Sequence, residues 1–300
     1  MQARTYLFVP GNRPERFAKA LASGADAVVL DLEDAVAPDA KLAARQAIAS
    51  WAASASAADR QRTVVRINEA ASPLCADDLR MLASAGLQAL MLPKAESAAQ
   101  VQQVCAALPG ARVLALIETA AGLAAVDQVA HSAGVQRLVY GTLDLALDLD
   151  LDISDAADGL ADLAGMAGLA DGASRITLAS RLAGLPAPVA GVTPQIDDEA
   201  RLLADLAWAR RFGFGAKLCI HPRQVAPLHA ALAPSAAQLA WARRVLAADA
   251  AQPGAAQLDG RMVDRPVVLQ ALRTLQRAGS DADTLQRAGS DADTLQRAGH

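Results

Sequence analysis

The amino-acid sequence predicts an α/β protein whose main part is a (β/α)8 TIM barrel, followed by a C-terminal helical extension. Eight short apolar runs rich in strand-forming residues recur along the chain, and a segment of helix length follows each of them. This alternation specifies a parallel sheet, and eight units favour its closure into a barrel. A doubly wound open sheet is the alternative, but the first strand continues into VPGNRPE and no G-x-G-x-x-G turn appears.

The predicted strands also indicate which side chains point into the barrel. In chain order they are residues 5–10, 26–32, 63–68, 89–94, 113–119, 137–144, 188–193 and 216–222. In the fifth strand, Leu114, Leu116 and Glu118 share one face because side chains alternate with a period of two. Almost every strand ends in a polar residue, and barrel active sites are built from strand ends at the C-terminal face. The sequence therefore predicts a site at that face.

The chain beyond the eighth strand exceeds what a barrel needs, which predicts three regions. Residues 1–226 form the barrel, residues 227–273 the helical extension and residues 274–300 a tail. The tail contains TLQRAGSDAD twice in tandem, followed by TLQRAG and a final histidine. Its glycines interrupt any helix and its apolar spacing of ten keeps no steady helical face, so we expect a solvated, partly disordered segment.

Composition and charge exclude several classes of partner. The 28 lysines and arginines are outnumbered by 32 aspartates and glutamates, so no net positive field attracts a nucleic acid or an anionic membrane surface. The N-terminal apolar run, residues 6–10, is too short for a signal peptide or a spanning helix, which predicts a cytoplasmic protein. Three widely spaced cysteines indicate neither a disulfide framework nor a thiolate metal site.

Two carboxylates at predicted strand ends suggest a metal site. Glu118 and Asp144 end the neighbouring fifth and sixth strands, with no histidine or cysteine near them in sequence. Oxygen-only ligands select a hard cation, and two carboxylates that leave room for water and substrate suit magnesium better than zinc or calcium. A structural pair of ion-paired acids is an equal alternative on these residues alone.

Charged residues at the second and third strand ends are candidates for the substrate site. Arg66 offers a planar fork for a carboxylate or a thioester oxygen, although a structural arginine bonded to loop carbonyls is equally compatible. Asp31, Glu33 and Asp34 follow a buried strand, so at least one should point into the barrel mouth, onto metal-bound water or onto Arg66. For His221 in CIHP we favour a structural donor over a general base.

Basic residues after the first strand are candidates for binding a phosphate group. Arg13, Arg16 and Lys19 lie at or just after the first strand-to-helix turn, where side chains and helix amides can meet a phosphate. Basic residues on helices are usually solvated, and the two interpretations are evenly balanced.

A series of motifs runs in order from about residue 4 to residue 272. They are TYLFVPGNRPERFAKA, GADAVVLDLEDAVAP, VVRIN, LPKAES, ALIETAAGL, YGTLDLALDL, ASRLAGLPAP, FGAKLCIHPRQV and MVDRPVV. Together they resemble the CitE-like (citrate lyase β-subunit-like) branch of the HpcH/HpaI aldolase family, which is related to malyl-CoA and citramalyl-CoA lyases. The stretch 153–173 matches only loosely, and the decapeptide tail is an addition to the family pattern.

The resemblance implies a magnesium-dependent carbon–carbon lyase that assembles as a homo-oligomer, usually a trimer and in some cases a hexamer. Magnesium would be held by the glutamate of IETA and the aspartate of GTLDL, here Glu118 and Asp144. Gly141, Thr142 and Leu143 of the same GTLDL motif would lie at the substrate.

The implied reaction is retro-Claisen cleavage of a short 3-hydroxyacyl-CoA, such as malyl-CoA or citramalyl-CoA, to acetyl-CoA and a 2-oxo acid, glyoxylate or pyruvate. Arg66 would stabilise the enolate of the leaving acetyl-CoA. Asp264, carried on a C-terminal helical lid extension over the active site of the adjacent subunit, would transfer the proton. Two alternatives stay open: a citrate lyase β-subunit acting on citryl-ACP within a complex, and a barrel that binds a 2-oxo acid and magnesium without turnover.

Overall fold

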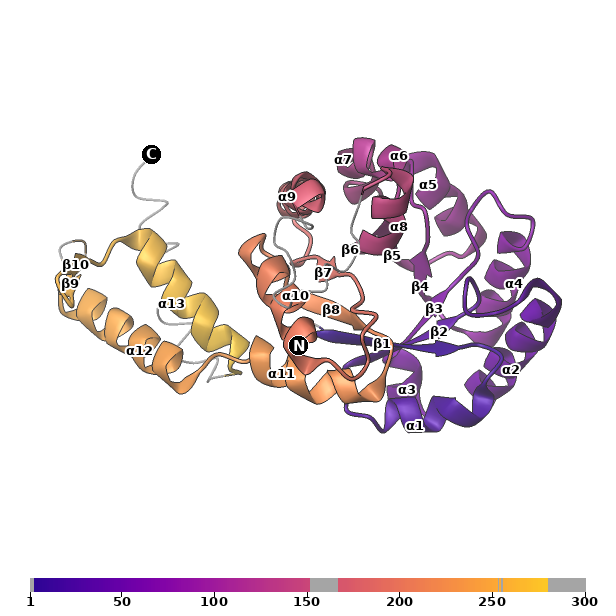
Figure 1. Cartoon of the computed structure of the whole chain (residues 1–300), viewed down its shortest axis with the longest axis horizontal. Coiled ribbons are helices and arrows are strands. Elements are labelled where there is room, and N and C mark those ends of the chain that lie inside the picture. Colours follow the sequence, from indigo (N-terminus) through magenta and orange to yellow (C-terminus); the bar gives the residue numbers. More distant parts are fainter. Residues whose placement is uncertain (1–2, 152–166, 253, 255, 280–300) are drawn as a thin grey trace. The chain divides into compact units, whose positions relative to one another are not determined.

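Eight parallel strands close into a barrel in the order in which they occur along the chain (Figure 1). They are β1 (Thr5–Pro10), β2 (Ala27–Asp31), β3 (Thr63–Arg66), β4 (Ala89–Leu92), β5 (Arg112–Ile117), β6 (Val135–Tyr140), β7 (Val189–Ala190) and β8 (Ala216–Cys219). The computed structural model describes residues 3–151, 167–252, 254 and 256–279. The closed parallel sheet confirms the predicted (β/α)8 barrel.

The interior of the barrel is filled by side chains that alternate along the strands. The interior cluster consists of Tyr6, Ala27, Val29, Val64, Ala89, Met91, Leu114, Leu116, Val139, Val189, Ala216 and Leu218. The strand residues between these, such as Leu7, Val28 and Ala115, are also buried. Both faces of the sheet are therefore covered, as a parallel sheet requires.

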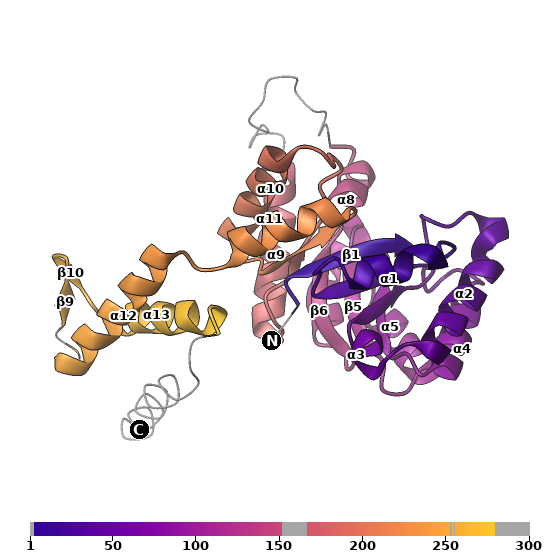
Figure 2. The same ribbon diagram turned by 90° about the horizontal axis from the view of Figure 1, so that it is seen from below.

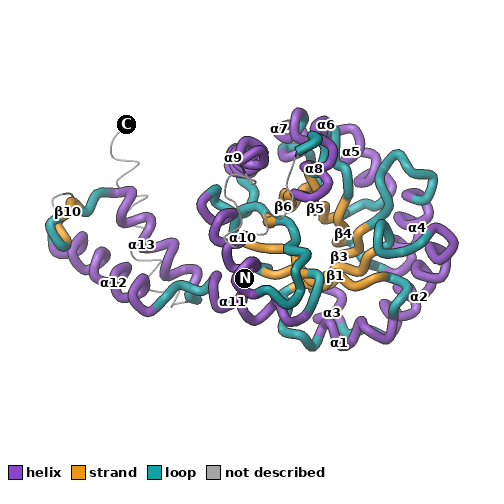
Figure 3. The backbone as a smooth tube through the Cα atoms, viewed as in Figure 1, coloured by secondary structure: helices purple, strands orange, loops and turns teal. Residues whose placement is uncertain are grey.

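Helices surround the strands and connect each one to the next (Figure 3). They are α1 (Phe17–Leu21), α2 (Lys41–Ser54), α3 (Ala57–Gln61), α4 (Cys75–Ala85), α5 (Ala98–Ala107), α6 (Ala120–Ala124), α7 (Val126–Ala130), α8 (Thr142–Asp148), α9 (Ala167–Leu182), α10 (Glu199–Arg211) and α11 (Val225–Leu232). Short 3-10 turns precede α1, α2 and α11 at Pro14–Arg16, Pro38–Ala40 and Pro222–Gln224. No helix in the described part of the chain is long and apolar enough to cross a membrane.

The sixth strand is shorter at its carboxyl end than the sequence predicts. The prediction extended it to residue 144, but β6 ends at Tyr140 and α8 begins at Thr142. Gly141 makes the last ladder hydrogen bond, from its N–H to the Ile117 carbonyl at 3.0 Å, and its own carbonyl accepts from Leu145 N–H at 3.1 Å. Asp144 therefore lies in the first turn of α8 and not at a strand end, which corrects the sequence-based placement.

The chain divides into two compact units, Met1–Ala230 and Ala231–His300. The described part of the second unit contains α12 (Ala236–Ala251), an antiparallel pair formed by β9 (Gln257–Leu258) and β10 (Arg261–Met262), and α13 (Arg265–Arg277). The helices α12 and α13 lie side by side (Figure 2). Their shared core consists of Ala242, Val245, Ala256, Val263, Ala271 and Leu275.

The observed elements cross both of the predicted region boundaries. The boundary after residue 226 falls within α11, which is attached to the barrel because His229 Nε2 lies 2.9 Å from Thr5 Oγ1 of β1. The boundary after residue 273 falls within α13, which continues to Arg277 because Leu275 lies one turn after the buried Ala271. For residues 274–277 the structure thus differs from the predicted tail, and residues 280–300 lie outside the described residues.

This difference gives a prediction about stability. Leu275→Ala should lower the free energy of unfolding by about 2–5 kcal/mol, because truncating a buried leucine leaves a cavity. A chain that ends at Gly279 should unfold at nearly the wild-type temperature, since it keeps the whole of α13. Circular dichroism melting curves compare the two. A drop of many degrees in the shortened chain would contradict the predicted solvated tail.

Candidate active site

A cavity of about 420 Å³ lies at the carboxyl ends of the barrel strands. Its lining residues are Phe8, Pro10, Asp31, Asp34, Ala35, Arg66, Leu116, Glu118, Gly141, Thr142, Leu143, Asp144, Gly191, Val192, Leu218 and Ile220. Most of the residues predicted for the metal and substrate site therefore meet in one cavity. Half of the wall is apolar, whereas the charged groups on it are four carboxylates and one guanidinium.

Glu118 follows β5 directly and is almost completely buried at 3% exposure. Its Oε1 accepts a hydrogen bond from the backbone N–H of Lys94 at 2.9 Å. Burial raises the pKa of Glu118 to about 8, an effect that the Lys94 N–H opposes and that the charge of Glu33 reinforces. In the metal-free chain burial therefore favours the protonated form of this carboxyl. A buried acid of this kind gains from a bound cation, which replaces the proton.

Two glycines allow the backbone to approach closely beside Glu118. A Cβ at position 141 would lie 2.5 Å from Glu118 Cβ and 2.7 Å from Glu118 Oε2. A Cβ at position 191 would lie 2.5 Å from Thr142 Oγ1 and 2.8 Å from the Tyr140 carbonyl oxygen. Only glycine fits at either position. The close packing sets the start of α8, and with it Asp144, against the strand end that carries Glu118.

Arg66 is held by carboxylates and not by loop carbonyls. Its Nε donates to Asp31 Oδ1 at 2.8 Å and its Nη2 donates to Asp31 Oδ2 at 2.6 Å, a fork-to-fork pair. The guanidinium carbon also lies 5.0 Å from the centre of the Phe8 ring. Burial alone would lower the pKa of Arg66, but the bonds to Asp31 and the nearby acids raise it. The side chain is a fixed cation at the cavity wall.

Two further acids lie close to Arg66. Glu33 Oε2 is 2.8 Å and Asp34 Oδ2 is 3.4 Å from Arg66 Nη1. Glu33 and Arg66 form an ion pair by distance, but the angles do not make it a hydrogen bond. The buried Oε2 of Glu33 therefore has no hydrogen-bond partner among the described residues. Burial raises the pKa of Glu33 to about 7, although the charge of Arg66 lowers it. The predicted contact of these acids with Arg66 is thus present in the geometry.

A buried lysine fixes the loop that carries these acids. Lys41 Nζ donates to the carbonyls of Leu32 at 2.6 Å and Glu33 at 2.7 Å, and to Asn68 Oδ1 at 2.8 Å. Two bonds to this loop and one to Asn68, two residues after β3, hold the two strand ends together. Lys41 therefore acts on the site through the backbone, and its charge is not directed at the cavity.

The donor chemistry of the site fits magnesium. Glu118 and Asp144 offer only oxygen to the shared cavity, and Glu118 Oε2 is the carboxylate oxygen that does not accept from Lys94. Within the described ranges no three His, Cys, Asp or Glu side chains form a complete protein cage for a metal. Magnesium is commonly bound by one or two carboxylates and keeps several waters, so two such ligands are sufficient.

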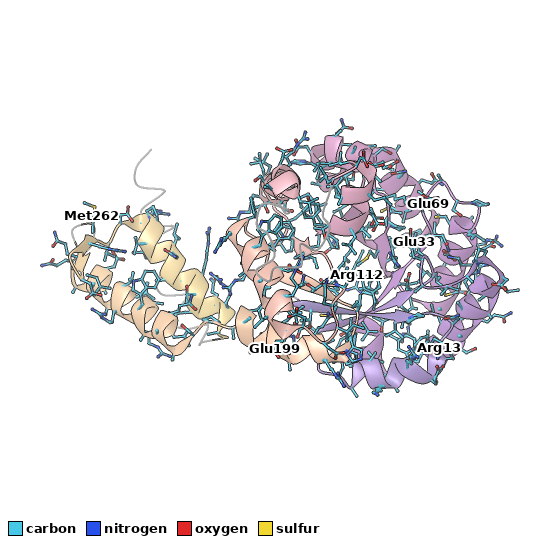
Figure 4. All side chains as sticks on the ribbon, viewed as in Figure 1. Arg13, Glu33, Glu69, Arg112, Glu199 and Met262 are labelled. Carbon is cyan, nitrogen blue, oxygen red and sulfur yellow. The ribbon has the colours of Figure 1, made fainter. Side chains whose placement is uncertain are left out.

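Three of the predicted residues lie outside the cavity lining and on the exposed surface. Arg13 Nε pairs with Glu15 Oε1 at 2.9 Å, and Arg16 Nε lies 3.9 Å from the same oxygen. Lys19 is exposed on α1. In Figure 4 the labelled Arg13 lies apart from the labelled Glu33. None of the three meets the charged groups of the cavity, so any contact with a ligand would be made by an extended part of that ligand.

His221 and Asp264 both make local caps. His221 Nδ1 accepts from the Arg223 N–H at 3.2 Å and caps the 3-10 turn before α11, a structural contact in which this ring nitrogen is an acceptor and not the expected donor. Asp264 lies in the second unit, where its Oδ1 accepts from the Val267 N–H at 3.2 Å at the start of α13. The Asp264 side chain is exposed.

Sequence reasoning counted Lys94 among the polar strand ends but gave no role to it, although its backbone N–H reaches the Glu118 carboxylate. It also omitted the apolar residues of the cavity wall, among them Phe8, Val192 and Ile220. Phe8 and Leu218 could have been found by the period-two rule in the first and eighth strands. The contact of Lys94 depends on its backbone angle, for which the sequence LPKAES gives no signal.

Comparison with known proteins places the chain among enzymes of one family. Residues 4–222 match the family described as HpcH/HpaI aldolase/citrate lyase. The citrate lyase subunit beta-like protein of Mycobacterium tuberculosis is 42% identical over 275 residues, which are 91% of this chain and 95% of that protein. The (3S)-malyl-CoA thioesterase of Cereibacter sphaeroides is 34% identical over 279 residues, 92% of this chain and 94% of that protein.

A solved structure gives the same relationship. The crystal structure of CitE from Mycobacterium tuberculosis in complex with magnesium, acetoacetate and coenzyme A matches with a TM-score of 0.81 at 40% identity. The match covers 93% of this chain and 98% of that chain. Since both the family match and the relatives span most of the sequence, this chain belongs to the HpcH/HpaI aldolase/citrate lyase family.

Proposed function

We propose that this protein is a magnesium-dependent carbon–carbon lyase that cleaves a short 3-hydroxyacyl-CoA, such as malyl-CoA or citramalyl-CoA, to acetyl-CoA and a 2-oxo acid. The observation that carries the proposal is the meeting of Glu118, Asp144 and Arg66 in one cavity whose wall is half apolar. The family match and the magnesium and coenzyme A in the similar CitE structure support it.

Each charged group has a separate task in this proposal. Glu118 and Asp144 would hold magnesium, which supplies a Lewis acid for the substrate carboxylate and hydroxyl. Arg66 places its fixed positive charge where the thioester oxygen gains negative charge as the bond between carbons two and three breaks. Asp31 keeps the guanidinium plane in place through its paired hydrogen bonds. The apolar wall formed by Leu116, Val192 and other residues excludes water from the enolate.

Carbon two of the acyl group becomes a carbanion equivalent when the bond breaks and must take up a proton before acetyl-CoA leaves. We assign this transfer to Asp264 of the adjacent subunit in a homo-oligomer, with the C-terminal unit acting as the lid; its carboxylate would take the proton of the substrate hydroxyl as the bond breaks and give it to carbon two. The exposed carboxylate of Asp264, bonded only weakly to its own helix start at 3.2 Å, is available for such a role. Arg13, Arg16 and Lys19 are proposed to meet phosphates of coenzyme A, since all three are exposed and the described acidic partner of Arg13 and Arg16 is the exposed Glu15.

The assignment of Asp264 predicts complementation between two inactive variants. Asp264→Asn and Glu118→Gln should each be nearly inactive alone. When the two are mixed and their subunits exchange, a site works if its barrel carries the Asp264 variant and its lid carries the Glu118 variant. Equal random mixing makes this about one half times one half, so roughly a quarter of wild-type activity should return around a cyclic oligomer. Absence of recovery, with exchange verified by mass spectrometry, would place Asp264 in its own site or outside the reaction.

The experiment that tests the proposed function is a substrate panel. Purified protein is given malyl-CoA, citramalyl-CoA or citryl-CoA, with magnesium and then with excess EDTA, and release of the 2-oxo acid is followed. We expect magnesium-dependent release from malyl-CoA or citramalyl-CoA. Turnover of citryl thioesters alone would favour the citrate lyase alternative, and no release from any of them would contradict the proposal.

A second candidate is thioester hydrolysis, because one relative at 34% identity is a (3S)-malyl-CoA thioesterase. In that reaction water attacks the thioester carbonyl, and malate and free coenzyme A are formed. The same cavity would serve, so only the products separate the two reactions.

A further inference from the structure

The backbone of Lys94 has a conformation that lysine rarely adopts. Its φ is +43°, in the left-handed region that favours glycine. The other non-glycine residues with positive φ in the described ranges are Asp150 and Asp259, and aspartate tolerates this region better than lysine does. Lys94 follows directly on Pro93 after β4, at the carboxyl end of the barrel. Something in the surrounding structure must hold it there.

The two residues that follow this position are attached to β5 and to the turn after it. The Ala95 N–H donates to the Leu116 carbonyl at 3.1 Å. Thr119 Oγ1 donates to Glu96 Oε1 at 2.8 Å. A Cβ at position 122 would lie 2.9 Å from the Ala95 carbonyl oxygen, so this turn packs closely on the loop. With these contacts fixed, the left-handed conformation of Lys94 directs its N–H away from the ladder.

That N–H donates to Glu118 Oε1 at 2.9 Å. The lysine ammonium, in contrast, pairs with Glu69 Oε2 at 3.3 Å, and both side chains are 42% exposed. An exposed pair of this kind contributes little to stability. The contact with the candidate magnesium ligand is therefore made by the backbone of Lys94, and the side chain is not needed for it.

We infer that Lys94 is a positioning residue whose left-handed backbone fixes the Glu118 carboxylate through Oε1 and leaves Oε2 for the cation. The inference rests on the proposed role of Glu118 as a magnesium ligand. It attributes the orientation of Glu118 to one backbone N–H group. Substitutions that keep this donor and its conformation should therefore keep the magnesium affinity, and substitutions that remove either should lower it. Glycine at position 94 adopts positive φ freely and keeps the N–H. Proline fixes φ near −65° and has no N–H.

The experiment measures magnesium affinity by titration calorimetry in the absence of substrate. Lys94→Gly should bind magnesium within about twofold of wild type, although it loses the ammonium. Lys94→Pro should bind it at least about tenfold more weakly, the usual effect of removing a group that orients a metal ligand. If the proline variant does not fold, Lys94→Val replaces it, because a branched Cβ opposes positive φ. Asp259→Val, with the same backbone conflict at φ +51° in the second unit, is the control and should keep wild-type affinity.

Three results of these titrations would contradict the role given to Lys94. The inference would be overturned if the proline variant, or the valine variant in its place, bound magnesium as tightly as the glycine variant. Equal weakness of the glycine and proline variants would also overturn it, because the ammonium would then be responsible. A wild-type chain that binds no magnesium would overturn the proposed metal site, and with it the role of Lys94.

Discussion

Glu118→Gln should abolish turnover and weaken magnesium binding by at least about a hundredfold. Groups that merely orient a metal ligand contribute ten- to hundredfold to affinity, and Glu118 is proposed to be a ligand itself. The amide keeps an oxygen that can accept the Lys94 N–H, but it removes the negative charge. Calorimetry measures the affinity, and release of the 2-oxo acid measures turnover.

The metal-free form provides the internal control for this variant. Burial raises the pKa of Glu118 to about 8, so glutamine resembles the protonated acid that burial favours. The unfolding free energy without magnesium should therefore change little. Glu69→Gln, at a half-exposed glutamate paired with Lys94, should change neither affinity nor turnover. Unchanged magnesium affinity in Glu118→Gln would remove Glu118 from the metal site.

Arg66→Lys should lose most activity while the protein remains folded. An ammonium cannot make the two parallel bonds to Asp31 and still reach Glu33, so its charge would not stay at the position proposed for the enolate. Removal of one donor to a developing oxyanion costs on the order of 10²–10³-fold in turnover. The values of kcat and KM separate the effects, and the loss should fall mainly on kcat.

Two further variants test the reason for that loss. Arg66→Met removes the charge and leaves the buried Asp31 unpaired, which should cost about 3–5 kcal/mol of stability. Arg80→Lys changes an arginine paired with an aspartate on the exposed surface and should have neither effect. Wild-type kinetics in Arg66→Lys would exclude Arg66 from the mechanism.

The alternation of apolar runs and helix-length segments was sufficient to predict the barrel and the order of its strands. It was also sufficient to bring Glu118 and Arg66 to one end, because strand ends of a parallel barrel meet at one face, whereas Asp144 reaches the same cavity from the first turn of α8. The exact end of β6 was not predictable in the same way. Gly141 continues the strand pattern in sequence, but its carbonyl accepts from the Leu145 N–H and α8 begins at the next residue.

The features that sequence reasoning could not supply depend on backbone angles and on packing between distant segments. The positive φ of Lys94 follows from the contacts of Ala95 and Glu96 with the β5 end, which periodicity does not reveal. The continuation of α13 into the first decapeptide follows from the packing of Leu275 against α12 in the second unit. In both places local residue preference predicted a different conformation, and tertiary contacts determined the result.

The central claim is cleavage of a carbon–carbon bond, and the identity of the first products tests it most directly. The purified protein is incubated with magnesium and malyl-CoA in water enriched in oxygen-18, and early products are identified by mass spectrometry. Cleavage predicts acetyl-CoA and glyoxylate in equal amounts, with the thioester intact and no free coenzyme A. Malate with one heavy oxygen in its carboxylate, together with free coenzyme A and without acetyl-CoA, would contradict the account and show hydrolysis instead.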